Sequence, residues 1–273
     1  MSNLRPTINN LQFLKLGGSL ITDKTRPHTP RLDALQRLAA EIAQAYQVNP
    51  RLALVLGHGS GSFGHVPARK YGTRAGVHTS EEWRGFVEVW RDAQALDRLV
   101  VDVLTDAGLP AAAFSPLASI TAEDGRVQAW DLRPIQHALS AGLLPVVYGD
   151  VSFDTRRGGT ILSTEDLFTF LNKALQPRHI LLAGIEAGVW WDYPECTRPI
   201  DMITPANYES IAPMLGGSAG TDVTGGMASK VRLSLEWVQS NPKLEVQIFS
   251  GEIFGSLVQA LTGQQLGTRV HGP

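Results

Sequence analysis

Residues 11–19 read Leu-Gln-Phe-Leu-Lys-Leu-Gly-Gly-Ser, and this stretch sets the fold class. Its apolar run predicts a buried strand over residues 11–16, and Gly17 and Gly18 predict a sharp turn where the strand ends. Lys15 lies near that end, where its ammonium group can hold an anion that the glycine backbone also contacts. A tight turn beside a surface lysine would give the same pattern, so both interpretations stay open here.

Apolar runs and helical patterns alternate along the rest of the chain. Short apolar runs predict strands, and apolar residues three or four apart predict helices between them. The predicted strands are residues 52–56, 111–114, 144–148, 180–183, 246–250 and 268–270, with a hairpin over residues 151–161. The predicted helices are residues 31–47, 79–107, 134–140, 163–175, 226–239 and 254–261. This alternation predicts an α/β fold in which helices cover both faces of a mostly parallel sheet.

The composition excludes several classes of protein. The chain has 273 residues, of which 43% are apolar, and its 24 Lys+Arg and 26 Asp+Glu give a formal net charge of -2. A charge near zero argues against nucleic acid as a partner, and the apolar fraction is too high for a disordered chain. The single cysteine, Cys196, excludes an intrachain disulfide and suits a reducing compartment. No apolar run approaches the ~20 residues of a membrane span, so we expect a cytoplasmic protein without a membrane partner.

Two further glycine-rich loops resemble anion sites. Gly57-His-Gly-Ser-Gly-Ser-Phe-Gly-His65 follows the strand at 52–56, and Gly220-Thr-Asp-Val-Thr-Gly-Gly-Met-Ala-Ser-Lys230 leads into a helix. Glycine costs roughly 0.5–1 kcal/mol relative to alanine unless its conformation is needed. Amide groups at the start of a helix bind anions, and His65 and Lys230 could add hydrogen bonds and charge. An ordinary helix start and a core or surface histidine are the alternative interpretations.

Together, the three loops and their lysines predict phosphate chemistry. One phosphate does not need three loops, whereas a nucleoside triphosphate together with a second anionic substrate does. Phosphoryl transfer depends mainly on positioning and charge neutralisation, which glycine loops, lysines and Mg²⁺ supply. The spacing Gly59-x-Gly61-x-x-Gly64 also matches a dinucleotide fingerprint, but weakly, because a glycine turn already follows the first strand.

At these residues the chain resembles the amino acid kinase superfamily and, within it, the isopentenyl phosphate kinases. The resemblance extends over about residues 14–270. Its motifs are Lys15-Leu-Gly-Gly-Ser-Leu-Ile-Thr-Asp-Lys24, Ser62-Phe-Gly-His65, Pro145-Val-Val-Tyr-Gly-Asp150, and Thr221-Asp-Val-Thr-Gly-Gly-Met227 with Lys230. It implies a three-layer α/β sandwich with a mostly parallel central sheet, forming one domain over residues 1–273. The implied N-lobe, about residues 1–177, binds the acceptor, and the C-lobe, about residues 178–273, binds the nucleotide.

The resemblance also implies ATP as phosphoryl donor, Mg²⁺, a small phosphorylated acceptor, direct in-line transfer and a homodimer, without a protein-bound metal site. The implied nucleotide-binding residues are Lys15, Gly17, Gly18, Ser19, Lys24, Gly61, Gly184, Thr224, Gly225 and Lys230. The implied acceptor-binding residues are Ser60, Gly61, His65, Asp150 and Thr164. Lys15, His65, Lys230 and Glu165 would act at the transferring group, with Glu165, or Asp166 in its place, organising the lysines. Helix 79–107, with Trp83, Phe86, Val87 and Trp90, resembles the wall of a prenyl pocket, although core packing would place the same residues there.

Two segments depart from the pattern of that family. Ser163-Thr-Glu165 stands where the family usually has Ser-Gly-Asp, and Gly184-Ile-Glu-Ala-Gly-Val189 stands where it usually has Thr-Asp-Val-Asp-Gly-Val. These departures leave two alternatives open. One is a kinase of the superfamily with another small anionic acceptor, and the other is a paralogue that binds a phosphorylated metabolite with little catalysis.

Overall fold

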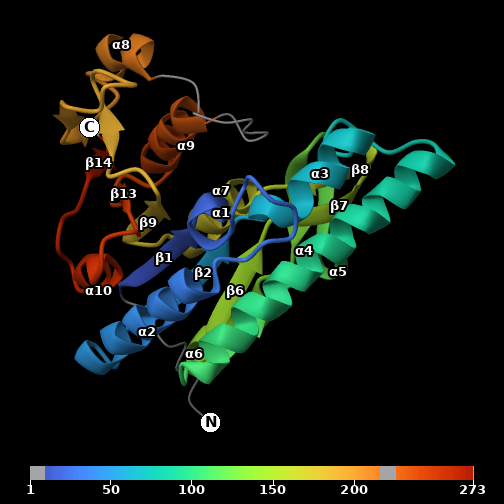
Figure 1. Cartoon of the computed structure of the whole chain (residues 1–273), viewed down its shortest axis with the longest axis horizontal. Coiled ribbons are helices and arrows are strands. Elements are labelled where there is room, and N and C mark those ends of the chain that lie inside the picture. Colours follow the sequence, from blue (N-terminus) through green and yellow to red (C-terminus); the bar gives the residue numbers. More distant parts are fainter. Residues whose placement is uncertain (1–9, 216–225, 273) are drawn as a thin grey trace.

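The computed structural model describes residues 10–215 and 226–272, and its largest element is one eight-stranded sheet (Figure 1). The strands lie in the order β12-β14-β13-β9-β1-β2-β6-β3. Neighbouring strands are parallel except β13 and β14, which run antiparallel. Their bounds are β1 Leu11–Leu16, β2 Ala53–His58, β3 Ala111–Ala113, β6 Leu144–Tyr148, β9 His179–Gly184, β12 Met202–Ile203, β13 Glu245–Ser250 and β14 Thr268–His271. The prediction of a mostly parallel central sheet is therefore confirmed.

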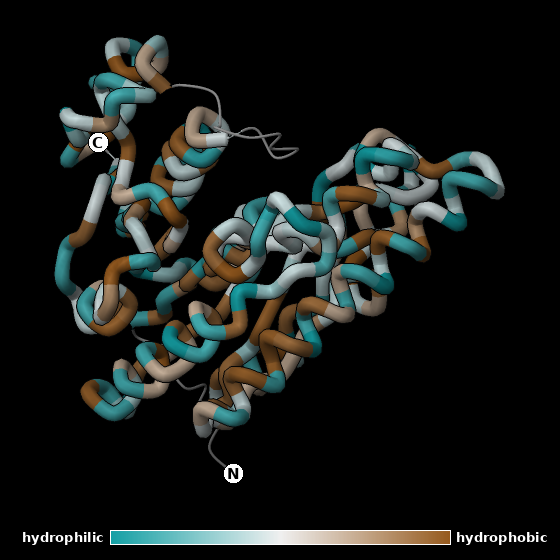
Figure 2. The backbone as a smooth tube through the Cα atoms, viewed as in Figure 1, coloured by the Kyte–Doolittle hydropathy of each residue, from teal (hydrophilic) through white to brown (hydrophobic). Residues whose placement is uncertain are grey.

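Helices cover both faces of this sheet because successive side chains of a buried strand point to opposite faces. Phe13 of β1 packs in one apolar cluster with α6 (Arg133–Ser140), α7 (Thr164–Leu175) and α9 (Gly226–Ser240). The next residue, Leu14, packs in a second cluster with residues of α2 (Leu32–Val48), α4 (Ser80–Asp106) and α10 (Ser256–Leu261). The central strands β1 and β6 are accordingly buried along their whole length and are mostly apolar (Figure 2). These two clusters make the predicted three-layer sandwich.

A second sheet of four strands extends the molecule beside α4. Its order is β5-β4-β7-β8, with bounds β4 Ile120–Glu123, β5 Arg126–Trp130, β7 Asp150–Asp154 and β8 Gly158–Leu162. β7 and β8 form the predicted hairpin. β4 and β5 were not predicted, because β5 buries only one of its five residues completely and so lacks an apolar pattern. A small apolar cluster joins this sheet to α4 through Phe86, Val89 and Val151.

The connections add short elements, and one of them differs from its prediction. α3 (Gly61–Tyr71) begins inside the predicted glycine loop, so part of that loop is the first turn of a helix. The other short elements are α1 Gly18–Ile21, α5 Pro116–Ser119, β10 Val189–Trp190, β11 Pro199–Ile200, α8 Tyr208–Ile211 and the 3-10 helix Ala212–Met214.

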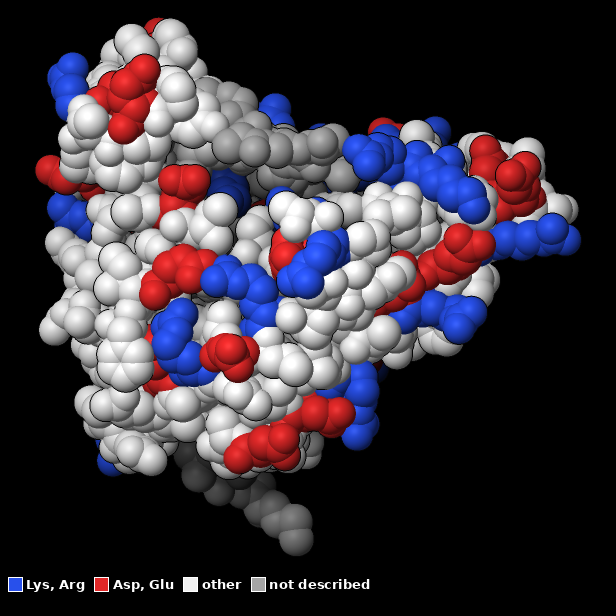
Figure 3. All heavy atoms as spheres, in the orientation of Figure 1, with Lys and Arg blue, Asp and Glu red and all other residues white. Residues whose placement is uncertain are grey.

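The boundary expected near residues 176–177 falls just after α7. β9 begins at His179 and pairs directly with β1, so the central sheet runs across that boundary. The division into lobes therefore stays a prediction. No described helix is long and apolar enough to cross a membrane. The face shown in Figure 3 carries basic and acidic side chains interspersed rather than a field of one sign.

Candidate active site

The carboxyl ends of the parallel strands open on one cavity. Gly17, Gly59, Gly149 and Gly184 follow or end β1, β2, β6 and β9, and all four line it. The chain first adds β2 and β6 on one side of β1 and later adds β9 on the other side, so β1 lies where the strand order reverses. Open α/β sheets bind ligands at such a reversal, outside the carboxyl ends of their strands.

The predicted catalytic, nucleotide-binding and acceptor-binding residues that the structure describes all line this cavity. They are Lys15, Gly17, Gly18, Ser19, Lys24, Ser60, Gly61, His65, Asp150, Thr164, Glu165, Gly184 and Lys230. Thr224 and Gly225 lie outside the described residues. The fold therefore brings together residues from six separate stretches of the chain, while the role of each stays a prediction.

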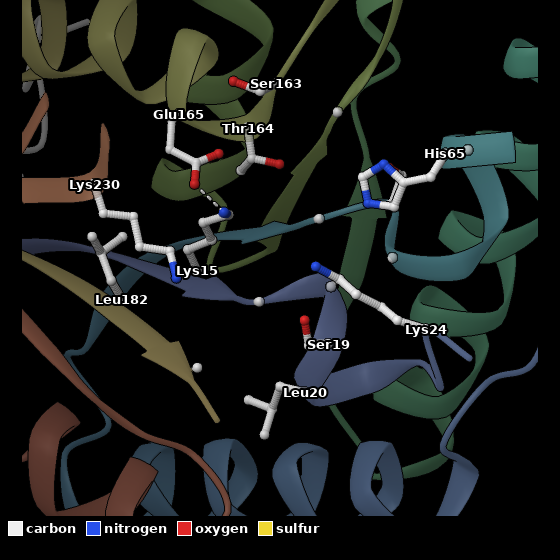
Figure 4. A pocket seen from close by; sticks show the side chains of 18 of the residues that line it. Lys15, Ser19, Leu20, Lys24, His65, Ser163, Thr164, Glu165, Leu182 and Lys230 are labelled. Atoms are coloured by element: carbon white, nitrogen blue, oxygen red, sulfur yellow. Dashed lines mark hydrogen bonds and ion pairs between the residues drawn. The ribbon is translucent and has the colours of Figure 1, made fainter. Parts of the chain in front are cut away.

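Lys15 and Glu165 form a nearly buried ion pair at the base of the cavity (Figure 4). The alternation of β1 turns Lys15 toward the same face as Phe13, which is the face that α7 and α9 cover. Burial alone would raise the pKa of Glu165. The charge and hydrogen bond of Lys15, together with the charge of Lys230, outweigh it and hold that pKa below its ordinary value. Glu165 is therefore ionised and fixes the Lys15 ammonium group toward the cavity.

The side chain of Glu165 is long enough to reach Lys15, whereas the Asp166 side chain binds elsewhere. The Asp166 carboxylate accepts hydrogen bonds from the backbone N–H and the hydroxyl of Ser163, both at 2.7 Å, and so caps α7. Thr164, which stands where the family has glycine, turns its hydroxyl away and donates to the carbonyl of His58 at 2.6 Å. Its side chain is buried, and Thr164 lines the cavity together with Ser163 and Glu165 at the start of α7.

The first two glycine loops contact each other directly, backbone against backbone. A Cβ atom on Gly18 would lie 2.6 Å from the nitrogen of Gly61, and one on Gly59 would lie 3.0 Å from the nitrogen of Gly18. Gly61 also has φ +51°, a conformation that side chains disfavour. These glycines are therefore needed for more than the close approach to a phosphate that the sequence suggests. They are also required where the two loops meet.

The cationic side chains enter the cavity from two sides. Lys24 and His65 point into the space between the glycine loops, and Lys230 approaches from the side of Lys15 and Glu165 (Figure 4). The loop that carries Lys24 is tied to α4, where His28 Nε2 lies 2.8 Å from the Asp92 carboxylate. The first residues of α3, α7 and α9 also line the cavity, and the amino end of a helix favours anions.

The end of the cavity beyond His65 has an apolar wall. Its wall is made by Ala68 of α3, Val89 and Ala93 of α4, and Ile161 of β8. The four α4 residues considered from sequence do not line it. Trp83, Phe86 and Trp90 pack in the cluster around Val77 and Val151, and Val87 is exposed. Helix α4 does form the wall, but through smaller residues, because its large aromatic side chains fill the core beneath the second sheet.

Asp150 is buried in the wall of the cavity. One carboxyl oxygen accepts the backbone N–H of Val151 at 2.7 Å, and the other has no hydrogen-bond partner among the described residues. Burial raises the pKa of Asp150 to about 8, the N–H of Val151 opposes that rise, and the nearby Asp97 carboxylate adds to it. Asp97 itself pairs with the buried His58 ring at 3.3 Å. Near neutral pH the Asp150 carboxyl group is therefore protonated.

Two groups at the cavity were not predicted as site residues. Arg74, in the connection between α3 and α4, pairs with Asp166 at 3.1 Å and belongs to no recognised motif. Ile185 and Glu186, which follow β9 in the segment that departs from the family pattern, line the opposite end. That end continues into a wider hollow bordered by the loop at 22–34, by Trp190 and Tyr193, and by Met214 and Leu215.

Residues 10–250 match the amino acid kinase family. This chain belongs to that family. It is 32% identical to the isopentenyl phosphate kinase of Methanocaldococcus jannaschii over 95% of this chain and 98% of the relative. It is 33% identical to that of Methanothermobacter thermautotrophicus over 95% and 98% of the two chains. A solved isopentenyl phosphate kinase superposes with a TM-score of 0.80 at 31% identity, covering 95% of this chain and 99% of that one.

Other solved structures share the fold at lower identity. A carbamate kinase from Giardia lamblia superposes with a TM-score of 0.66 at 15% identity, covering 97% of this chain and 99% of that one. The three-layer fold is thus common to kinases with different acceptors. What distinguishes this kinase must lie in the walls of its cavity.

Proposed function

We propose that this kinase transfers the γ-phosphoryl group of ATP to the phosphate of isopentenyl phosphate, giving the diphosphate and ADP. The observation that carries the proposal is that cationic side chains and an apolar wall line one and the same cavity. Lys15, Lys24 and Lys230 suit the phosphates, and the wall containing Val89 and Ala93 suits a short hydrocarbon tail. The similarity to isopentenyl phosphate kinases over nearly the whole chain supports the same acceptor.

In this mechanism an oxygen of the acceptor phosphate attacks the γ-phosphorus of ATP while the bond to the β-phosphate oxygen breaks. The attacking oxygen is already largely ionised near neutral pH, so no general base is required. Lys15, held by Glu165, and Lys230 neutralise the charge on the transferring group. His65 orients the acceptor phosphate, and the backbone of Gly18 and Gly61 supports the phosphates on either side.

Mg²⁺ would accompany the nucleotide rather than occupy a site of the protein. Among the described residues, no group of three or more His, Cys, Asp or Glu side chains could hold a metal ion. Mg²⁺ commonly takes its ligands from substrate phosphates and water, which suits a cavity lined mostly by glycines and cations. When bound, the ion would neutralise charge on the ATP phosphates.

A coupled assay of ADP release with ATP and isopentenyl phosphate tests the proposal. We expect His65→Ala to lose most of the activity, whereas Cys196→Ala, which changes a residue outside the cavity, should keep it. Activity on another small phosphate or carboxylate in preference to isopentenyl phosphate would favour the second kinase interpretation. Binding of isopentenyl phosphate without binding of ATP in calorimetry would favour a metabolite-binding paralogue instead.

We also propose that the enzyme works in the cytoplasm as a homodimer. The single cysteine, Cys196, suits a reducing compartment, in which ATP is also at hand. Light scattering after size-exclusion chromatography tests the second part, since a mass near 29.6 kDa would show a monomer.

A further inference from the structure

The first turn of α7 carries two consecutive carboxylates that serve opposite sides of the cavity. Adjacent residues of a helix point about 100° apart, so Glu165 and Asp166 diverge. Glu165 pairs with Lys15 at the end of β1, and Asp166 pairs with Arg74 between α3 and α4. The first pair serves the transferring group in the proposed function, whereas the second pair has no assigned role.

Arg74 is fixed at both its backbone and its side chain. Its carbonyl oxygen accepts hydrogen bonds from Arg157 Nη1 at 3.2 Å and from the Thr160 hydroxyl at 3.0 Å. The Arg157 guanidinium is held in turn by the Asp124 carboxylate at 2.9 and 2.7 Å. The turn carrying Arg74 is therefore attached to the second sheet, so the side chain starts from a defined position.

The Arg74 guanidinium lies at the amino end of α7. Its Nη2 donates to the same Asp166 oxygen that accepts hydrogen bonds from the N–H and hydroxyl of Ser163. The guanidinium therefore lies beside the first backbone amides of that helix. Asp166 is its only hydrogen-bond partner among the described residues, and a guanidinium has five N–H donors. The side chain is 42% exposed and Arg74 lines the cavity, so donors remain for an anion.

The position of Arg74 in the chain assigns it to the acceptor rather than to ATP. His65 and Ala68 on α3 precede it, and Val89 on α4 follows it, and these residues form the acceptor end of the cavity. A guanidinium matches the oxygens of a phosphate in a bidentate arrangement and stays charged throughout the reaction. We propose that Arg74, oriented by Asp166, binds the phosphate of the acceptor and lowers its repulsion from the incoming phosphoryl group.

This inference rests on the proposed function, and Arg74→Gln tests it. Loss of one charge-assisted contact should raise the KM for isopentenyl phosphate about 10- to 100-fold, by the usual strength of such bonds. The KM for ATP should stay within about twofold, because Arg74 lies away from the nucleotide loops. Arg74→Lys keeps the charge without the planar fork and should fall between the two proteins. Arg98→Gln is the matched control, since Arg98 forms an exposed pair with Asp102 on α4.

An unchanged KM for isopentenyl phosphate in Arg74→Gln would overturn the inference. So would an equal rise in both KM values together with a lower Tm, which would show that Arg74 only stabilises the fold. The two proposals can fail separately. A wild-type protein that is inactive in the ADP-release assay would defeat the proposed function. Calorimetric titration with isopentenyl phosphate would then still test Arg74, by whether Arg74→Gln weakens binding of the acceptor. Equal binding by the wild-type and Arg74→Gln proteins would again refute the role.

Discussion

Replacing Asp150 with asparagine should stabilise the protein, and the gain should be larger at pH 8 than at pH 5. In the folded chain this carboxyl group keeps its proton up to about pH 8, whereas its ordinary pKa is 3.8. Between those values the folded state holds a proton that the unfolded state has released, so the free energy of unfolding falls as the pH rises. Asparagine has nearly the same shape and cannot ionise, so the free energy of unfolding of the variant does not fall with pH for this reason.

The size of the effect follows from the shift. About three pH units separate pH 5 from pH 8, and each unit is worth about 1.4 kcal/mol, so this one carboxyl group costs the wild-type protein about 4 kcal/mol over that range. Because Asp150 is only 1% exposed, water does not screen the effect. Below the ordinary pKa, Asp150 no longer makes the free energy of unfolding depend on pH, since both the folded and the unfolded states are then protonated.

Urea unfolding of both proteins at pH 5 and pH 8 measures this difference. The other titratable groups are common to both proteins, so their effects cancel in the comparison. Asp102→Asn removes an exposed carboxylate of α4 and should leave the difference between the two pH values nearly unchanged. If Asp150→Asn changes the free energy of unfolding by the same amount at both pH values, the carboxyl group is already ionised at pH 5 and the reasoning fails.

Three further substitutions test the site and its framework. Glu165→Gln should lower kcat by about tenfold or more, because Lys15 loses the charge that orients it, and steady-state kinetics of the folded variant would show it. Gly18→Ala should destabilise the protein by more than about 2 kcal/mol, since its Cβ would press on the nitrogen of Gly61, and a normal urea midpoint would contradict the loop contact. Thr79→Ala should cost about 1 kcal/mol through the lost capping box of α4 without changing kcat, as unfolding and kinetics on one preparation would reveal.

The strands of the central sheet could be predicted because both their faces are buried. β1 and β6 are mostly apolar, which marks them in the sequence without knowledge of their neighbours. β5 is largely exposed, and its pairing with β4 depends on contacts that residues 120–130 do not reveal. Short strands with one open face therefore escaped prediction, although the hairpin beside them did not.

The motif residues were recognised because they lie in or beside glycine-rich loops or in segments that match the family motifs, whereas Arg74 has neither context. Arg74 meets Asp166 across 92 residues of sequence, and only the second sheet brings them together. The sequence also could not show which α4 residues line the cavity. Large side chains on one helix face pack into whichever layer covers them. Here that layer is the cluster around Val151, which leaves Val89 and Ala93 to face the cavity.

The contact between Gly18 and Gly61 fixes the distance between the two glycine loops of the cavity. The two main chains touch, and the buried Thr22 hydroxyl, which donates to the carbonyl of Gly18 at 2.8 Å and accepts from the N–H of Ser62 at 2.9 Å, holds them together. The spacing between donor and acceptor phosphates is then a property of the main chain, set when β1 and β2 pair. Substitutions in the apolar wall could change which tail is accepted while the distance over which the phosphoryl group travels stays the same.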